Sequence, residues 1–319
     1  MLKKAKELTD FKHKNSPSII LIGISGFVGT AISKILIDKG QNINLPLKNQ
    51  LDITTLKSIK QFIFKAKPEV LINFAAYTNI NNAEKERGDK KSLAWKINAE
   101  GSKNLALLCK EFNIFLIHIS TDSVFPGTKN DPGPYKENDI PPITLEPLSW
   151  YSYTKLIGEQ TVVNSGAKYA IVRISYPFGN FDSPKDFLVK TIKYIKSNIS
   201  FFSDQTFTPT YIPDLAKAIA IIAISKKKGI YHITCTGIIT PYKFAVYLGK
   251  KLGLNNKIHK QNLSDYLKKP NSIKRSKYGG LLNEITQKTL DLKLLSWQKA
   301  IDNCLDDSQF GDRNNKLTP

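Results

Sequence analysis

The chain has 319 residues, a formal net charge of +20 and 41% hydrophobic residues. That hydrophobic content is ordinary for a protein that buries a full core, and no apolar run is long enough to predict a membrane span. The three cysteines lie far apart without a CxxC pair, and the four histidines lack ligand spacing, so we expect reduced thiols and no metal site.

The positive charge does not by itself predict nucleic-acid binding. Only four of the 47 basic residues are arginines, the residue type that makes bidentate contacts to bases. The lysines are spread along the whole chain instead of forming one patch. We interpret them as a general basic surface and expect no nucleic-acid partner.

The first half of the chain alternates short apolar runs with helical periodicity. The predicted strands cover residues 18–22, 42–47, 70–74, 114–120 and 169–174, and the predicted helices cover 27–38, 54–65, 93–111 and 151–163. This alternation predicts an α/β fold, a Rossmann-type doubly wound parallel sheet with helices on both faces. The second half is less regular and predicts a smaller C-terminal lobe, with helices at 186–196, 213–223, 242–252 and 297–305 and a strand at 229–233.

Three glycines follow the first predicted strand with the spacing GxxGxxG: Gly23, Gly26 and Gly29. The first glycine permits a sharp turn, the second lets a pyrophosphate approach the backbone, and the third lets the following helix pack closely. Free N–H groups at the helix start then hold the phosphates. The pattern predicts a dinucleotide site; the alternative is a glycine-rich turn of another α/β fold.

The preferred cofactor depends on the end of the second predicted strand. That strand ends without an acid that would bind the adenosine ribose, and Lys48 follows it. NADPH is therefore favoured, with NADH as the alternative. Asp52 either accepts a hydrogen bond from the adenine amine or caps a helix with Thr54 close by, and the sequence leaves both interpretations open.

Tyr151 and Lys155 form a YxxxK pair on a predicted helix, where both side chains share one face. A neighbouring ammonium favours the phenolate, so we expect a lowered tyrosine pKa and a general acid. Tyr247 and Lys251 repeat the spacing in the distal lobe, where we interpret them as surface residues. Thr121 directly follows the fourth predicted strand and either polarises a substrate carbonyl or only forms a turn and cap; the downstream Tyr151 favours the first.

These motifs together resemble the extended short-chain dehydrogenase/reductases, from about residue 19 to 305. The most specific stretch is 120–127, Ser-Thr-Asp-Ser-Val-Phe-Pro-Gly, and further similar stretches are 70–78, 82–84, 97–99, 151–159, 172–176, 204–205, 209–210 and 296–297. The resemblance is strongest to the branch that reduces the C4 ketone of nucleotide-linked 4-keto-6-deoxyhexoses, as in dTDP-rhamnose biosynthesis. Alternatives are an epimerase or dehydratase of the same superfamily, or a non-catalytic sugar-nucleotide or NADP-binding subunit.

The resemblance implies a role for each matching residue. Tyr151 is the implied proton donor and Lys155 its partner and nicotinamide-ribose ligand, while Thr121 polarises the carbonyl and Asn98 supports the active-site helix and a relay water. The implied cofactor-binding residues are Gly23, Gly26, Phe27, Val28, Gly29, Asp52, Ile53, Ala75, Ala76, Tyr77, Tyr151 and Lys155, and the implied substrate-binding residues are Thr121, Asp122, Tyr176 and Gln205.

The chain departs from the family pattern on the substrate side. Where the family has tryptophan after the fifth strand, this chain offers Tyr176 or Phe178; residues 141–146 are inserted, and the late arginine motif is altered around Arg275.

The predicted domains follow from the elements and the resemblance. They are a flexible extension at 1–17, an NAD(P)-binding domain at 18–178 (rejoined by about 205–235), a substrate-binding lobe at 179–204 and 236–308, and a polar tail at 309–319. We expect a cytoplasmic enzyme with a nucleotide-sugar substrate and no membrane partner, and allow for a homodimer.

Overall fold

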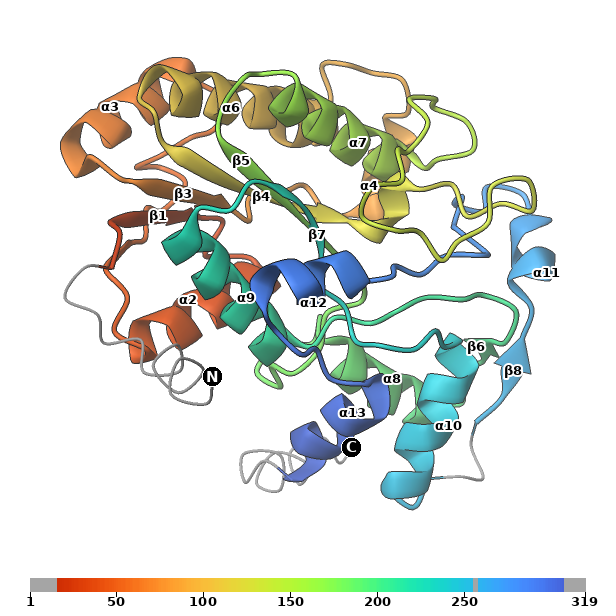
Figure 1. The fold of residues 1–319 in the computed structure, drawn as a ribbon. Helices are drawn as coiled ribbons and strands as arrows, with labels where there is room; N and C mark the ends of the chain where they lie inside the picture. The colour runs from red at the N-terminus through yellow and green to blue at the C-terminus, as the bar shows by residue number, and fades with distance from the viewer. Residues whose placement is uncertain (1–15, 255–257, 307–319) are drawn as a thin grey trace. The chain divides into compact units, whose positions relative to one another are not determined.

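The computed structural model describes residues 16–254 and 258–306 (Figure 1). They form two compact units. The first contains the described residues up to Ser120, with Thr154–Val172 and Leu215–Ile230; the second contains Thr121–Tyr153, Arg173–Asp214 and the described residues from Tyr231 onward. Segment 121–153, which the sequence analysis assigns to the cofactor domain, thus groups with the second unit. The predicted tail and nearly all of the predicted extension lie outside the described residues.

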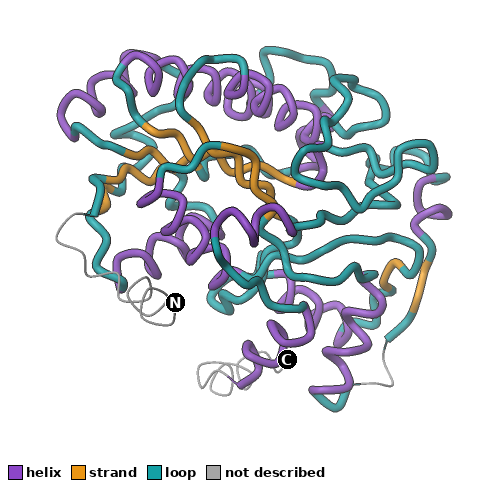
Figure 2. The backbone as a smooth tube through the Cα atoms, viewed as in Figure 1, coloured by secondary structure: helices purple, strands orange, loops and turns teal. Residues whose placement is uncertain are grey.

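One six-stranded sheet, with the order β2-β1-β3-β4-β5-β7, dominates the fold (Figure 2). Its strands are β1 (Ile19–Ile22), β2 (Ile43–Asn44), β3 (Val70–Asn73), β4 (Phe115–Thr121), β5 (Tyr169–Ile174) and β7 (Gly229–His232). β1 pairs in parallel with both β2 and β3, and β3 pairs in parallel with β4. The predicted α/β fold is confirmed, and the strand order reverses at β1, where doubly wound sheets bind ligands.

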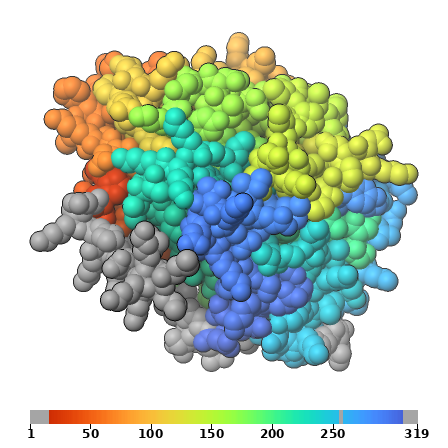
Figure 3. All heavy atoms as spheres, viewed as in Figure 1, coloured from red at the N-terminus to blue at the C-terminus, as the bar shows by residue number. Residues whose placement is uncertain are grey.

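Helices cover the sheet of the first unit. They are α2 (Phe27–Asp38), α3 (Leu56–Ala66), α4 (Ile80–Lys85), α6 (Ser102–Glu111), α7 (Trp150–Val163) and α9 (Ile212–Ser225). β1 and β3 are buried along their whole length, as expected for parallel strands covered on both faces. α3 packs beside α6, visible as adjoining orange and yellow atoms in Figure 3, and Ile59 and Leu105 join the same buried cluster.

The predicted helix at 93–111 is divided into three parts. A short α5 (Leu93–Trp95) leads into a π-helix, η1 (Lys96–Gly101), and α6 follows. Such wide turns concentrate at functional sites, and this one contains Asn98. The prediction of one regular helix is therefore wrong here, because apolar periodicity does not report a single widened turn.

The second unit has an aromatic core and short strands. Its elements are η2 (Asp122–Val124), α8 (Phe187–Lys196), β6 (Phe201–Phe202), α10 (Pro241–Lys251), β8 (Lys260–Gln261), α11 (Leu263–Leu267), α12 (Glu284–Leu290) and α13 (Trp297–Asp306). Phe178, Phe207 and Phe244 pack together in one buried cluster. Within residues 16–254 and 258–306, no helix has the length and apolarity needed to cross a bilayer.

Candidate active site

The glycine loop lies directly against the end of β3. Gly23 has a φ of +88°, and a Cβ there would stand 2.4 Å from the Ala75 nitrogen and 2.5 Å from the Phe74 carbonyl carbon. A Cβ on Gly29 would stand 2.3 Å from the Gly23 oxygen. Both positions therefore require glycine, and the loop closes the point where the strand order reverses.

The start of α2 is open to an anion. Its N-cap is Gly26, which offers no side-chain cap, and its first turn, beginning with Phe27 and Val28, contains no acid. The Gly26 amide is bonded within the loop, to the Gly23 oxygen at 3.0 Å. Helix N-terminal amides without side-chain partners attract phosphate through the helix dipole. The cradle therefore fits the pyrophosphate of a dinucleotide.

A surface hollow of about 550 Å³ lies in the segment that follows β2, lined by Leu47, Lys48, Asn49 and Asp52. The Oδ1 atom of Asp52 accepts hydrogen bonds from the Thr54 amide (2.9 Å) and hydroxyl (2.8 Å). The N-cap of α3 is Thr55, so Asp52 braces the preceding turn and does not cap the helix. The side chain of Ile53 is buried in the core, unlike the hollow-lining Asp52.

Asn98 clamps the chain after β3 to the helical layer. Its Oδ1 accepts the Tyr77 amide at 2.8 Å, and its Nδ2 donates to the Tyr77 carbonyl (3.1 Å) and the Thr154 hydroxyl (3.0 Å). Both amide protons are thereby used. The segment with the predicted cofactor residues Ala75, Ala76 and Tyr77 is held in place by a side chain of the π-helix.

Lys155 is buried on α7, and its Nζ donates to the Ile119 carbonyl at 2.7 Å. Burial lowers the pKa of Lys155 to about 8, and the charge of Glu159 opposes this shift. The ammonium is therefore easier to deprotonate than an ordinary lysine.

Tyr151 and Thr121 meet in the second unit. Burial raises the pKa of Tyr151 to about 12, and the charge of Asp122 adds to the rise, while a hydrogen bond with Thr121 lowers it. The pKa shift is thus opposite to the one that the YxxxK spacing predicts, because burial and a carboxylate dominate it. Thr121 also caps η2 by accepting the Ser123 amide at 3.2 Å, so the capping interpretation holds alongside the catalytic one.

Both carboxylate oxygens of Asp122 are engaged by hydroxyl groups. Oδ2 accepts from the Ser175 hydroxyl at 2.6 Å, and Oδ1 accepts from the Thr121 hydroxyl at 3.1 Å. Burial raises the pKa of Asp122, and these hydrogen bonds lower it. Ser175 is not among the predicted site residues, since a serine after a strand carries no signal of its partner.

The aromatic position after β5 is Tyr176, whose φ is +41°. Its ring packs against Phe187 and Phe207, with centroids 5.0 and 4.5 Å away. Gln205 donates through Nε2 to the Tyr176 hydroxyl at 3.4 Å, so the structure brings these two predicted substrate residues together. Phe178, the other candidate, is fully buried in the core.

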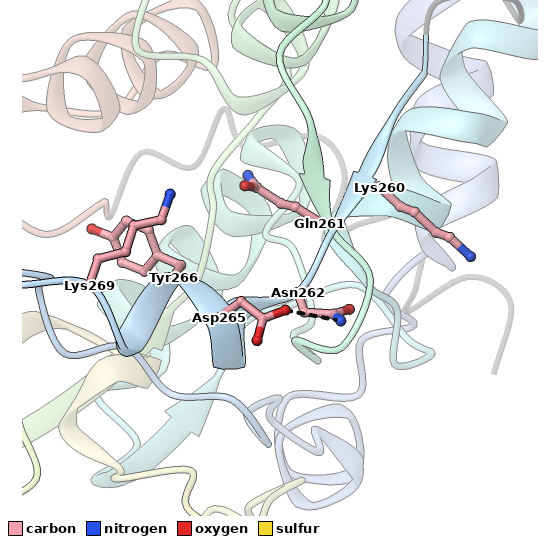
Figure 4. A pocket seen from close by; sticks show the side chains of 6 residues that line it. All are labelled: Lys260, Gln261, Asn262, Asp265, Tyr266 and Lys269. Carbon is pink, nitrogen blue, oxygen red and sulfur yellow. Dashed lines mark hydrogen bonds between the residues drawn. The ribbon is translucent and has the colours of Figure 1, made fainter.

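A further pocket, of about 330 Å³, lies at β8 and α11 (Figure 4). None of the predicted site residues lines it. The Arg275 guanidinium lies 5.7 Å from the ring centroid of one lining residue, Tyr266. The sequence offered no motif for this pocket, whose lining residues are Lys260, Gln261, Asn262, Asp265, Tyr266 and Lys269.

Comparisons with known proteins agree along nearly the whole chain. The family model described as "RmlD substrate binding domain" matches residues 17–310. A dTDP-4-dehydrorhamnose reductase of Aggregatibacter actinomycetemcomitans is 30% identical, over 89% of this chain and 97% of the relative. Among solved structures, the dTDP-4-dehydrorhamnose reductase of Bacillus anthracis in complex with NADP has a TM-score of 0.80 at 27% identity, covering 92% of this chain and 100% of that one. The structure of a dTDP-4-dehydrorhamnose reductase of Clostridium acetobutylicum has a TM-score of 0.78 at 32% identity, covering 92% of this chain and 99% of that one.

Proposed function

The chain belongs to the RmlD substrate-binding domain family, and from this membership we propose that it reduces the C4 ketone of a nucleotide-linked 4-keto-6-deoxyhexose with NADPH. The reaction is that of a dTDP-4-dehydrorhamnose reductase, the name carried by relatives that align with most of this chain. The cofactor assignment is supported by the solved relative in complex with NADP.

The observation that carries the proposal is the hydrogen-bonded pair of Thr121 and Tyr151. The raised pKa of Tyr151, about 12, keeps its hydroxyl protonated at neutral pH. A protonated phenol donates a proton to the oxygen of a ketone as that oxygen gains charge. Thr121 donates a second hydrogen bond to the same oxygen and stabilises the developing charge.

The chemistry that NADPH supplies when bound is a hydride for the C4 carbon. Gly23, Gly26 and Gly29 leave room for the pyrophosphate, and the amides of Phe27 and Val28 at the start of α2 bind it. Lys48 and Asp52 bind the adenosine end from the hollow that they line. Ala75, Ala76, Tyr77 and the backbone of Ile53 complete the cofactor contacts.

Lys155 binds the nicotinamide ribose with its ammonium. Asn98 acts by positioning: its fully used amide protons fix Tyr77 and Thr154. On the sugar side, Asp122, Tyr176 and Gln205 contact the nucleotide sugar, the last two as a hydrogen-bonded pair. We assign the enzyme to the cytoplasm, which the three buried free cysteines support.

The test is NADPH oxidation with a dTDP-linked 4-keto-6-deoxyhexose, followed as loss of NADPH absorbance. We expect turnover that depends on both reactants and a 4-hydroxy product. Absence of oxidation in a protein that binds NADPH would refute the proposal. Conversion of the sugar without net NADPH oxidation would instead identify an epimerase or dehydratase.

A further inference from the structure

We infer that Ser175 is a positioning residue of this enzyme, whose hydroxyl anchors the Asp122 carboxylate that orients the Thr121 hydroxyl next to Tyr151. The inference rests on the proposed function, because it assigns Ser175 to the reduction of the ketone. It also changes the role of Asp122, from a ligand of the sugar to a part of the support behind the carbonyl-polarising hydroxyl.

The backbone of Ser175 is fixed on both sides by one residue. The Ser175 amide donates to the Thr210 hydroxyl at 2.9 Å, and the Thr210 amide donates to the Ser175 carbonyl at 2.7 Å. Thr210 is fully buried and donates its own hydroxyl proton to the Ile233 carbonyl at 2.8 Å. Ser175 therefore cannot shift without breaking this set of buried bonds, and its hydroxyl starts from a fixed point.

The next residue shows that this turn is held against a conformational preference. Tyr176 has a φ of +41°, in the left-handed region that non-glycine residues seldom adopt. Such conformations persist only where the surrounding structure determines them, and they concentrate at functional sites. The Ser175–Tyr176 turn thus places two side chains at the site, one bonded to Asp122 and the other to Gln205.

The bond from Ser175 to Asp122 is short, at 2.6 Å between Oγ and Oδ2. Hydroxyl-to-carboxylate bonds of this length are charge-assisted and strong. A carboxylate withdrawn from water is costly without donors. The half-buried Asp122 carboxylate has the hydroxyl groups of Ser175 and Thr121 as donors, together with the backbone amides of Asp122 and Ser123. Removing the Ser175 hydroxyl would leave Oδ2 without its short bond and free the carboxylate to turn.

The fixed carboxylate defines where the Thr121 proton can point. Thr121 Oγ1 accepts the Ser123 amide at 3.2 Å, and it lies 3.2 Å from the Ser123 hydroxyl oxygen. Its proton is directed to Asp122 Oδ1 at 3.1 Å, while the Tyr151 hydroxyl is its further hydrogen-bond partner, and from this position the proton can turn to a bound ketone oxygen. Preorganised donors of this kind stabilise the transition state because they need little rearrangement during the reaction.

The charge of Asp122 also acts on the two tyrosines that face it. It raises the pKa of Tyr151 from α7 and of Tyr176 after β5, while Arg275 lowers the pKa of Tyr176. The Ser175 hydrogen bond lowers the pKa of Asp122 against the effect of burial. Loss of that bond should therefore let Asp122 take up a proton at a higher pH, and the acidic limb of the rate profile should move the same way.

The experiment is a graded series at position 175: Ser175→Thr, Ser175→Cys and Ser175→Ala, which keep, weaken and remove the donor. We expect Ser175→Ala to lower kcat about tenfold, with KM changed much less and the acidic limb moved to higher pH. Ser175→Cys should fall between, and Ser175→Thr should restore kcat. The matched control is Ser165→Ala in the turn after α7, which removes a hydroxyl bonded, among the described residues, to the Val162 carbonyl and the Ala167 amide.

A second measurement needs no turnover. The carboxyl carbon of Asp122, identified by comparison with Asp122→Asn, is titrated by ¹³C NMR in the wild type and the series. A higher Asp122 pKa in Ser175→Ala, with a wild-type pKa in Ser175→Thr, supports the role of Ser175 in holding Asp122 even if the keto sugar is not reduced. The positioning role of Ser175 and the proposed reduction can therefore be refuted independently. An unchanged pKa, or equal loss of kcat in Ser175→Thr and Ser175→Ala, would overturn the inference; if Ser175→Ala does not fold, Ser175→Cys decides.

Discussion

Replacing Gly158 by alanine tests whether the contact between α7 and the π-helix is as tight as the structure shows. Gly158 lies inside α7, where alanine is preferred over glycine by about 1 kcal/mol. Helix propensity alone therefore predicts that Gly158→Ala stabilises the protein. A Cβ at this position, however, would stand 2.3 Å from the Asn98 carbonyl oxygen and 3.2 Å from the Ser102 hydroxyl oxygen.

The size of the effect follows from what has to move. Ordinary contact begins at 3.4 Å, so the 2.3 Å approach requires the two backbones to separate by about 1 Å. The Asn98 carbonyl is held by the Ser102 hydroxyl at 2.7 Å, and its side chain clamps Tyr77. Overpacking of this kind costs about 1–3 kcal/mol. After the gain in propensity, we expect a net loss of up to about 2 kcal/mol, and Tm should fall by about 2–4 °C per kcal/mol.

The assay is thermal unfolding by circular dichroism, together with NADPH affinity measured by fluorescence. The matched control is Gly249→Ala in α10, where the Cβ would meet the Cδ1 atom of Ile258 at 2.4 Å. That atom ends a flexible side chain and can move, so this variant should be neutral or slightly stabilised. Gly158→Ala should also weaken NADPH binding, because Asn98 holds Tyr77. Equal increases in Tm for both variants would refute the argument.

Three further predictions concern the proposed chemistry. Tyr151→Phe should lower kcat by about two to four orders of magnitude with NADPH affinity unchanged, and an unaltered kcat would exclude Tyr151 as proton donor. Because the pKa of Lys155 is lowered to about 8, its charge is lost as the pH rises through that value; the pH profile of kcat/KM should fall above about pH 8, and Lys155→Met should lack this limb. Lys48→Glu should raise the KM for NADPH at least about tenfold and affect NADH little, whereas an equal change for both cofactors would show that Lys48 does not face the 2′-phosphate.

The parts of the fold that could be predicted from the sequence are those that depend on neighbouring residues in the chain. The glycine loop is one, because its spacing encodes a turn in which two glycines prove sterically necessary, Gly23 against Ala75 and Gly29 within the loop. The parallel sheet is another, since β1 is a continuous apolar run and β3 is apolar up to Asn73. By contrast, the π-helix at Asn98 and the two-residue strands β6 and β8 leave no periodic signal, because each depends on contacts made elsewhere in the fold.

The Tyr151 pKa shows why a correct motif can still give the wrong physical expectation. The YxxxK spacing places an ammonium on the same helix face and predicts a lowered tyrosine pKa. In the structure the Lys155 ammonium donates to the Ile119 carbonyl, while burial and the Asp122 charge raise the Tyr151 pKa. Asp122 lies 29 positions before Tyr151 in the chain, and its carboxylate accepts a hydrogen bond from the distant Ser175, so no local pattern contains this information. In the proposed reaction Tyr151 has to be protonated before hydride transfer. The charge of Asp122 favours that state, whereas a neighbouring ammonium would favour the phenolate.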